Sequence, residues 1–465
     1  MRAFTLAHAS RQSGRAHLVG TSAVPNFEMS YRASMENPVD PAAPVPWSLL
    51  PPNAGLDDEG GLTVGGVSVA ELAAQFGTPV FIYDEAHLRA RCEEAVAAFG
   101  PGVAFASKSF WCVAMAKIAS AAGMSIDVST SGEMAVALAA GIDPERLRFH
   151  GNNKSVAELA AALEVGVGRI IIDSADEIAR LETLAAATGV TPKVWIRVTP
   201  GVHAHTHAFV QTGQEDSKFG FSVASGAAAA AVAEIQATGL LNLVGIHAHI
   251  GSQVFNLENF AQAASVVAAF FTPLGLAELC LGGGLGEAYV AGESAPSIAA
   301  WAASTIDALH DAGVGPDVEI TAEPGRSIVA RAGITVYTVG TIKDLPGLRT
   351  YAAVDGGMSD NPRPVLYGSG YETFLVRAPK AERPRSIRLV GKHCESGDVL
   401  VESGWVPDDL HVGDLLATPV TGAYGYSMAS NYNRVGRPPV VFVENGSARL
   451  VLRRETDQDL LALEV

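Results

Sequence analysis

Short apolar runs alternate with longer, Ala-rich stretches through the middle of the chain, a pattern that predicts alternating strands and helices. The apolar runs lie at 103–106, 125–128, 148–150, 169–173, 193–198, 243–249, 278–281 and 317–322. Capping boxes at Ser155/Glu158 and Ser174/Glu177 open two of the helices. Because strands that alternate with helices form parallel sheets, eight repeats over about 220 residues favour a closed (β/α)8 TIM barrel. An open doubly wound sheet is the alternative.

The segments on either side of the repeats have a different pattern of apolar and polar residues. Before the repeats, Ser68 and Glu71 form a capping box that opens a helix. Residues 79–83 are then predicted to form a strand, and Asp84 to cap a helix that runs to about residue 99. After about residue 333, strand-like runs separated by turn signals predict a second, mostly β domain, barrel- or sandwich-like. These runs lie at 334–339, 350–354, 386–390, 399–402, 414–419 and 439–444.

We therefore expect four parts in the chain. Residues 1–45 are polar, carry no acid before Glu28, and are expected to be a disordered extension or the product of a start codon placed too early. A targeting peptide is the other interpretation of this segment. Residues 46–84 are expected to contribute to the β domain, 85–330 to form the barrel, and 331–465 to form the C-terminal β domain.

Composition narrows the classes of function. The 465 residues are 48% apolar and 17% charged, which excludes global disorder. Acids outnumber bases 49 to 32, giving a net charge of −17, so neither nucleic acid nor an anionic membrane is expected as a partner. The four cysteines form no CxxC pair, and a cytoplasmic location fits better than an oxidising one. Residues 260–277 are uncharged but contain Pro and Gly, which favours a buried helix and its exit over a membrane span.

Polar or glycine-rich segments follow every predicted barrel strand, where the catalytic groups of such barrels lie. They are Lys108, Asp127 with Ser129, His150, Asp173, Arg197, His249 with Ser252, the glycines at 282–286, and Glu323 with Arg326. The glycine cluster allows a phosphate to approach the backbone, and Arg326 adds a fork of donors for the same anion.

Single residues leave alternatives open. Lys108 ends an apolar strand, as a Schiff-base lysine does, or it reaches to the rim as an ordinary lysine. Glu323 suits the nitrogen of a pyridinium ring, or an ion pair with Arg326. His247 and His249 share a strand face, and histidines also alternate at 203, 205 and 207, which suggests a metal-dependent hydrolase. No Asp or Cys set completes such a site, and we expect no metal.

Taken together, the motifs over residues 65–465 resemble one family. They are FASKS at 105–109, DVSTSGE at 127–133, HGNNK at 150–154, TGQEDSKFG at 212–220, HAHIGSQ at 247–253, GGGLG at 282–286, EPGR at 323–326, CESGD at 394–398 and GAYGYSMASNYN at 422–433. This ordered series resembles the pyridoxal-phosphate-dependent decarboxylases of the alanine-racemase-like fold, and within them the diaminopimelate decarboxylases. The resemblance implies release of carbon dioxide from meso-diaminopimelate to give L-lysine, the last step of lysine biosynthesis.

The resemblance also implies a role for each matching residue. Lys108 would form the Schiff base with pyridoxal 5'-phosphate, His249 would stack on its ring, and Glu323 would bind the ring nitrogen. The phosphate and the rest of the cofactor would be held by Ser252, Gly283, Gly284, Gly286, Pro324, Gly325, Arg326 and Tyr424. Arg326, Arg363, Tyr367, Glu395 and Tyr424 would bind the amino-acid substrate. Cys394, the proton donor, and Glu395 would come from the partner subunit of a homodimer with shared active sites.

Related activities share the core motifs. Ornithine and arginine decarboxylases act on substrates that lack the second amino-acid head, so they need no arginine equivalent to Arg363, and ornithine decarboxylases have Asp where Glu395 stands. A racemase would release no carbon dioxide and would not need the CESGD loop. Relatives that have lost activity act as binding proteins, but this chain retains Lys108, His249, Glu323 and Cys394.

Overall fold

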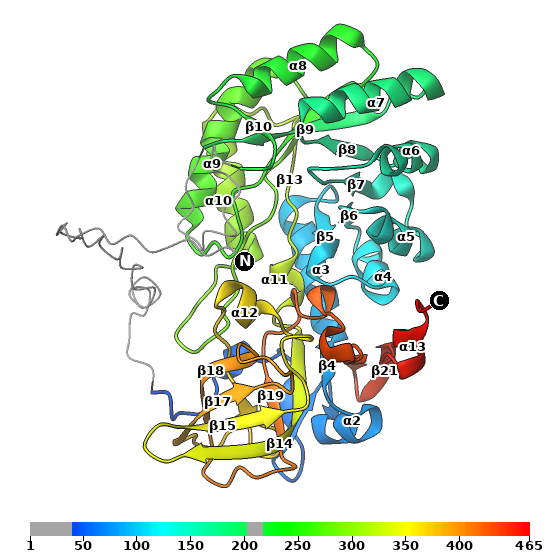
Figure 1. Ribbon diagram of the computed structural model, residues 1–465. Coiled ribbons are helices and arrows are strands. Elements are labelled where there is room, and N and C mark those ends of the chain that lie inside the picture. The colour runs from blue at the N-terminus through cyan, green and yellow to red at the C-terminus, as the bar shows by residue number, and fades with distance from the viewer. Residues whose placement is uncertain (1–39, 202–216) are drawn as a thin grey trace, which may run out of the picture. The chain divides into compact units, whose positions relative to one another are not determined.

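Eight parallel strands form one sheet, in which each strand lies beside the next one along the chain (Figure 1). The structure is a computed structural model and describes residues 40–201 and 217–465. The strands are β5 (Ala104–Ala106), β6 (Ser125–Val128), β7 (Leu147–Phe149), β8 (Arg169–Ile172), β9 (Lys193–Thr199), β11 (Asn242–Ala248), β12 (Glu278–Cys280) and β13 (Glu319–Thr321). A short strand, β10 (Phe221–Ser222), also pairs with β9. The histidines at 203, 205 and 207 and the motif residues 212–216 lie outside the described residues.

The two ends of this sheet meet and nearly close it into a barrel. The N–H of Ala104 donates to the carbonyl of Ala322 at 3.0 Å, and that of Ala106 donates to the carbonyl of Pro324 at 3.1 Å. These bonds join β5 to the segment that continues β13. The barrel predicted from the alternating pattern is therefore confirmed, and the open doubly wound sheet is wrong.

Helices between the strands cover the outside of the barrel. They are α3 (Glu85–Phe99), α4 (Val113–Ala121), α5 (Ser131–Ala139), α6 (Val156–Val165), α7 (Ala175–Thr188), α8 (Ala227–Thr238), α9 (Leu257–Phe271) and α10 (Ile298–Asp311). The predicted helix in the uncharged run is α9, and a 3₁₀ turn with Pro273 follows it. In the described part of the chain, no helix is both long and apolar enough to cross a membrane.

The predicted helix caps have different outcomes. Ser155 and Glu158 form the complete capping box that opens α6. The Ser174 side chain accepts from the N–H of Glu177, but the Glu177 carboxylate turns to the N–H of Asp173 instead of closing the box. Ser68 precedes α2 (Val69–Phe76) without a capping bond from its side chain, so the box predicted with Glu71 is wrong.

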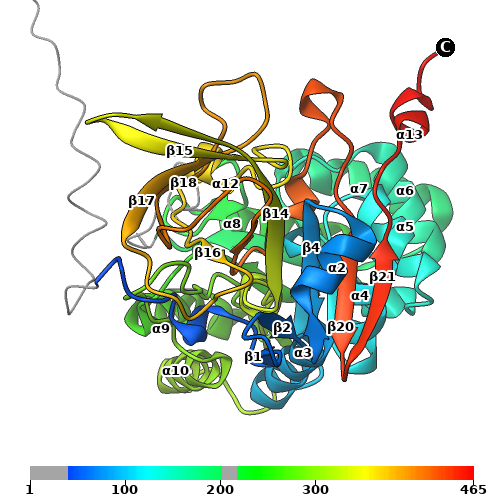
Figure 2. The ribbon, with the colours of Figure 1, turned by 90° about the horizontal axis from the view of Figure 1, so that it is seen from below.

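A second sheet gathers strands from both ends of the chain (Figure 2). Its central strand β4 (Val80–Asp84) pairs antiparallel with β14 (Gly333–Leu345) and parallel with β20 (Val440–Glu444). The sheet is completed by β15 (Arg349–Val354), β16 (Phe374–Leu375), β17 (Arg385–Val390), β18 (Val399–Val406), β19 (Leu415–Thr418) and β21 (Ser447–Leu452). The predicted mostly β region is therefore confirmed, with β4 built into it. A three-stranded sheet of β1 (Ala54–Leu56), β2 (Leu62–Val64) and β3 (Val67–Ser68) precedes it.

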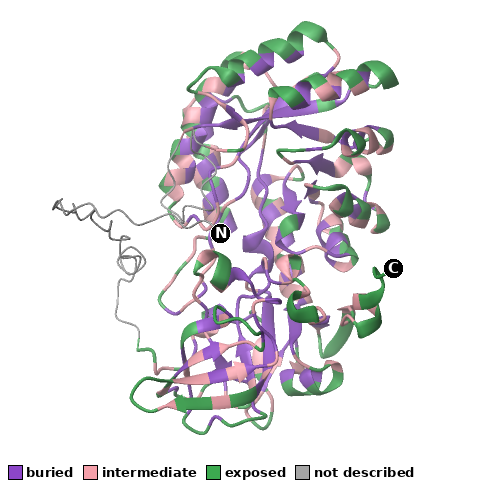
Figure 3. Cartoon of the chain, viewed as in Figure 1, coloured by how far each residue is buried: buried purple, intermediate pink, exposed green. Residues whose placement is uncertain are grey.

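The barrel strands are among the most buried parts of the molecule (Figure 3), but the two faces of the barrel sheet differ in chemistry. On β9, Val194, Ile196 and Val198 belong to the large apolar cluster, whereas Trp195 alternates with them and packs with Ile171 and Cys280 in a small separate cluster. The barrel interior therefore contains few aliphatic side chains. Buried charged and polar groups fill much of the remaining space.

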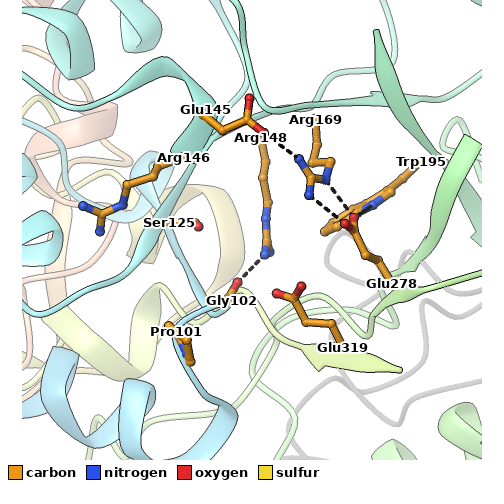
Figure 4. Close-up of a pocket in the computed structure, with 10 residues that line it drawn as sticks. All are labelled: Pro101, Gly102, Ser125, Glu145, Arg146, Arg148, Arg169, Trp195, Glu278 and Glu319. Atoms are coloured by element: carbon orange, nitrogen blue, oxygen red, sulfur yellow. Dashed lines mark hydrogen bonds and ion pairs between the residues drawn. The ribbon is translucent and has the colours of Figure 1, made fainter. Parts of the chain in front are cut away.

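Charged side chains line a cavity of about 240 Å³ at the end of the barrel where the strands begin (Figure 4). Glu278 binds Arg169 at 2.6 and 2.7 Å and accepts from Nε1 of Trp195 at 2.6 Å. The guanidinium of Arg148 lies 4.7 Å from the centre of a Trp195 ring and donates to the carbonyl of Gly102. Because these groups bond mainly to one another, they close this end, and the predicted site residues lie at the opposite end of the strands.

Candidate active site

Lys108 lies immediately beyond the first barrel strand, in the 3₁₀ turn η3 (Ser107–Ser109), and is exposed. Ser109 fixes this turn from two directions. Its hydroxyl donates to the carbonyl of Ala106 at 2.8 Å, and its carbonyl accepts from the N–H of Tyr424 at 2.8 Å. The amine expected to form a Schiff base is therefore accessible, and the Tyr424 loop from the β region lies beside it.

The glycines after β12 form a loop that leaves no room for side chains. A Cβ on Gly283 would lie 2.2 Å from the carbonyl oxygen of Glu323, and one on Gly284 would lie 2.4 Å from that of Gly251. A Cβ on Gly286 would lie 3.1 Å from the ring of Phe255. This loop packs directly against the segments that carry Glu323 and Ser252, so the predicted phosphate-binding elements are neighbours.

Arg326 joins several predicted cofactor residues. It begins α11 (Arg326–Val329), donates from Nη2 to the hydroxyl of Ser252 at 3.0 Å, and lies with its guanidinium 4.9 Å from the centre of the Tyr424 ring. Its Nε is buried without a hydrogen-bond partner in the described part of the chain. A buried donor of this kind is costly unless an anion or another acceptor satisfies it. Arg326 is therefore suited to hold a phosphate.

Pro324 and Gly325 bring Arg326 close to β5, the strand that precedes Lys108. The carbonyl of Pro324 accepts the closing bond from Ala106, and a Cβ on Gly325 would lie 3.0 Å from the Cβ of Ala106. The end of β5 and the segment of residues 324–325 are therefore in direct contact, and Lys108 and Arg326 closely follow them.

His249 lies just beyond β11 and accepts a hydrogen bond at Nδ1 from the N–H of Gly283 at 3.2 Å. Burial lowers the pKa of His249 well below its usual value, and the nearby cations Lys108 and Arg197 add to this effect. A neutral ring held by the glycine loop fits the predicted stacking role.

Glu323, at the end of the barrel opposite the charged cavity, has hydrogen bonds and ion pairs on both carboxylate oxygens. His247 Nε2 lies 2.9 Å from Oε2, His150 Nε2 lies 3.1 Å from Oε1, and the thiol of Cys280 donates to Oε1 at 3.3 Å. Burial alone would raise the pKa of Glu323, but His150 and His247 outweigh it and hold that pKa well below the usual range. Glu323 is therefore an anion, as required of a partner for a protonated ring nitrogen.

The predicted substrate arginine, Arg363, is buried at the start of α12 (Arg363–Tyr367) and connects to Arg326 through aromatic rings. Its guanidinium lies 4.2 Å from the centre of the Tyr289 ring, and its Nη1 donates to the hydroxyl of Tyr371 at 2.5 Å. The hydroxyl of Tyr289 accepts from Arg326 Nη1 at 2.6 Å. No motif in the sequence predicts a role for Tyr289 or Tyr371, since a lone tyrosine after glycines is typical of a core residue.

Three predicted residues form no hydrogen bond, ion pair or ring contact with this cluster in the described part of the single chain. Tyr367 ends α12 and is half-buried. Cys394 and Glu395 lie exposed in the loop after β17, where the N–H of Cys394 donates to the side chain of Asn433 at 3.2 Å. The carboxylate of Glu395 accepts hydrogen bonds from its neighbours Ser396 and Gly397. The structure thus brings together the predicted cofactor residues and Arg363, but not these three.

His150, His247 and Glu323 also form a group whose ligand atoms all lie within 4.8 Å of one another, a spacing that could hold a metal ion. The sequence pattern predicts no role for His150 beyond its place at a strand end, and it suggests His247 only as a possible metal ligand. Their contact with Glu323 depends on how the strands are arranged around the barrel, which no local motif encodes.

Comparison with known proteins matches this site to one family. Residues 85–330 match the family described as "Pyridoxal-dependent decarboxylase, pyridoxal binding domain". The diaminopimelate decarboxylase of Mycobacterium tuberculosis is 49% identical over 437 residues, covering 90% of this chain and 98% of that protein.

Solved structures of diaminopimelate decarboxylases are also similar to this chain. The diaminopimelate decarboxylase of M. jannaschii in complex with L-lysine has a TM-score of 0.82 at 30% identity, covering 89% of this chain and 98% of that one. The Helicobacter pylori enzyme complexed with L-lysine has a TM-score of 0.78 at 30% identity, with 85% and 98% covered. The chain therefore belongs to the diaminopimelate decarboxylases, within the pyridoxal-dependent decarboxylases.

Proposed function

We propose that this protein removes carbon dioxide from meso-diaminopimelate with the help of pyridoxal 5'-phosphate and releases L-lysine, as the last step of lysine biosynthesis. One observation carries the proposal beyond family membership. The buried Arg363 shares the Tyr289 ring with Arg326. With Arg326 engaged by the phosphate, Arg363 is a fixed cation that suits a substrate carrying a second carboxylate as well as the one it loses.

The residues at the site fit pyridoxal phosphate. Lys108 offers an accessible amine for the aldehyde, Glu323 a charged carboxylate for the ring nitrogen, and His249 a neutral ring for stacking. Arg326 with its unpartnered Nε, Ser252 and the glycines of the loop after β12 suit the phosphate. When bound, this cofactor supplies an electron sink for the pair of electrons left at the α-carbon.

The protein's own groups control charge and protons. Lys108 would hold the cofactor through its amine, would yield that position to the amine of the substrate, and would take it back as the product leaves. Glu323, held as an anion by two histidines, stabilises a proton on the ring nitrogen. Cys394 Sγ is proposed to return a proton to the α-carbon after carbon dioxide leaves. Arg363 and Tyr367, with Glu395, are proposed to hold the far amino-acid head of the substrate.

A homodimer with shared active sites is part of the same proposal. Cys394 and Glu395 are exposed and form no hydrogen bond or ion pair with the cofactor residues in the described part of the chain, which supports their reaching a site on a partner subunit. We also propose that the chain divides into its four parts after residues 45, 84 and 330. A cytoplasmic location is part of the same proposal. The matched family segment, 85–330, supports the barrel boundaries.

The experiment is a measurement of carbon dioxide release with added pyridoxal phosphate. meso-Diaminopimelate is compared with ornithine, arginine and lysine as single substrates, and the product is identified by mass spectrometry. Release from diaminopimelate alone, with lysine as product, supports the proposal. Release only from another amino acid would refute the roles of Arg363 and Glu395. No release, with tightly bound metal in the purified protein, would favour the metal-hydrolase alternative.

A further inference from the structure

A chain of three buried titratable side chains runs beneath the cofactor residues. Asp127 on β6 lies with Oδ1 3.6 Å from Nε2 of His150, and the same nitrogen lies 3.1 Å from Oε1 of Glu323. None of the three side chains is more than about one-tenth exposed. The resemblance to the decarboxylase family explains Glu323 through the cofactor, but it assigns no role to Asp127 or His150.

Two histidines contact Glu323, and they differ in charge. Burial opposes a charge on His150, but Glu323 and Asp127 outweigh it and raise the pKa of His150 to about 9. His247 has only Glu323 as an acidic neighbour, and burial lowers its pKa to about 4. At neutral pH, one carboxylate therefore contacts an imidazolium through one oxygen and a neutral imidazole through the other.

Other charged groups face this chain from the surrounding strands. The charge of Arg148 on β7 lowers the pKa of Asp127, and Arg197 comes from β9 with Nη1 4.0 Å from Oδ2 of Asp173. Cys280 on β12 donates its thiol to Glu323, and burial raises the pKa of that thiol well above its usual value. In the described part of the chain, neither arginine forms a salt bridge with Asp127 or Glu323, so His150 is the cation that contacts both carboxylates.

We propose that His150 is a positioning residue that holds the one proton of the Asp127–His150–Glu323 chain and so keeps Glu323 an anion for the ring nitrogen of the cofactor. This inference rests on the proposed function, since it concerns the group that Glu323 would bind. With His150 charged, the three side chains together carry one negative charge, which matches one protonated ring nitrogen.

Removal of His150 changes this balance. Asp127 and Glu323 would then face each other as two carboxylates in a buried site, where like charges raise the affinity for a proton. Burial, followed by the charge of Glu323, already raises the pKa of Asp127 to about 6. Without the imidazolium, a proton from solvent would enter the pair. Whenever it resides on Glu323, that residue can no longer stabilise a charged ring nitrogen.

The first test uses the protein without cofactor, so it does not depend on the reaction. Histidine labelled with ¹⁵N distinguishes imidazolium from neutral imidazole by NMR. At pH 7.5 we expect one protected imidazolium that disappears in His150→Gln, and one protected neutral ring that disappears in His247→Gln. A neutral His150 in the folded wild-type protein would overturn the proposal, whatever the activity of the enzyme.

The second test uses rescue. With pyridoxal phosphate bound, His150→Gln is expected to shift the pH profile of the cofactor's absorption spectrum towards the form with an unprotonated ring and to lower kcat at least tenfold. Adding Asp127→Asn removes the negative charge that faces Glu323, and the double variant is expected to recover a kcat within about threefold of the wild-type value. If His150 were only structural, the double variant would be no better than the single one, and the proposal would fail. Thermal unfolding of all variants verifies folding, and absence of carbon dioxide release by wild type would refute only the proposed function.

Discussion

The hydroxyl of Tyr289 accepts a hydrogen bond from Nη1 of Arg326 at 2.6 Å. The face of the same ring lies 4.2 Å from the guanidinium of Arg363, whose Nη1 in turn donates to Tyr371. One aromatic side chain thus fixes an arginine proposed for the cofactor and an arginine proposed for the substrate. The two contacts are chemically separate, since one uses the hydroxyl and the other the ring.

Tyr289→Phe is expected to weaken cofactor binding while leaving the ring under Arg363 in place. A hydrogen bond to a charged group contributes about 1.5–3 kcal/mol, so the Kd for pyridoxal phosphate should rise roughly 10–100-fold. Tyr371→Phe is the matched control, because it removes the hydroxyl partner of Arg363 instead. It should raise KM for diaminopimelate and leave the cofactor Kd near the wild-type value. Equal effects of both variants on cofactor binding would contradict this division of roles.

Gly282 gives a second prediction because its backbone and its surroundings both require glycine. Its φ is +67°, and a Cβ would lie 2.6 Å from the carbonyl oxygen of Ala248 and 2.7 Å from Nδ1 of His249. Gly282→Ala should therefore displace His249 and weaken cofactor binding at least tenfold, as measured by fluorescence titration. Gly275 has a similar φ of +62° with open space around it, so Gly275→Ala should cost only about 1 kcal/mol of stability and leave cofactor binding unchanged.

More of the fold than of the candidate site can be predicted from the sequence. Each barrel strand is predictable because its apolar run and the helical stretch after it are local features, and Ser155 with Glu158 forms the expected capping box. The box at Ser68 fails although it has the same letters, since a cap also depends on how the preceding chain enters the helix. The short strands β10 and β16 have too few residues for a pattern to appear.

Site residues were found where a motif is contiguous and missed where it is assembled across the barrel. Lys108 and Arg326 stand in short signatures, and the structure brings their segments together. His150 meets Glu323 from a strand that lies 173 positions earlier in the chain, a contact fixed by strand order alone. Tyr289 lies outside the glycine motif. Its partners come from α11 and α12, and no spacing in the sequence predicts that meeting.

The buried charge on His150 predicts a particular pH dependence of stability. Its pKa is raised to about 9 in the folded protein, against about 6.5 for an exposed histidine. Between these values the folded state binds a proton that the unfolded state has released, so the free energy of unfolding falls as pH rises. The stabilisation from His150 is therefore complete below about pH 6.5 and lost by about pH 9.

Thermal unfolding measured from pH 6 to pH 10 checks this sign. The midpoint for wild type should decrease through this range by more than the midpoint for the double variant His150→Gln/Asp127→Asn, which lacks both the histidine and the carboxyl group that would take up its proton. The difference between the two proteins should be largest at the acidic end. A constant difference across the range would mean that His150 is not charged in the folded protein.

The exposed loop with Cys394 leads to the last prediction, which concerns the assembly of the site. Lys108→Ala removes the amine and Cys394→Ala removes the proposed proton donor, so each homodimer should be inactive while remaining folded. If Cys394 acts on the partner subunit's cofactor, a mixed dimer contains one site in which both residues are intact. Random exchange of equal amounts should then restore about a quarter of the wild-type activity per site, since half the dimers are mixed. Verified exchange by native mass spectrometry without recovery would show that each chain builds its site alone. Recovery in the absence of exchange would point to contaminating wild-type enzyme, and a mixture of Lys108→Ala with the double variant Lys108→Ala/Cys394→Ala, which can form no intact site, measures that background.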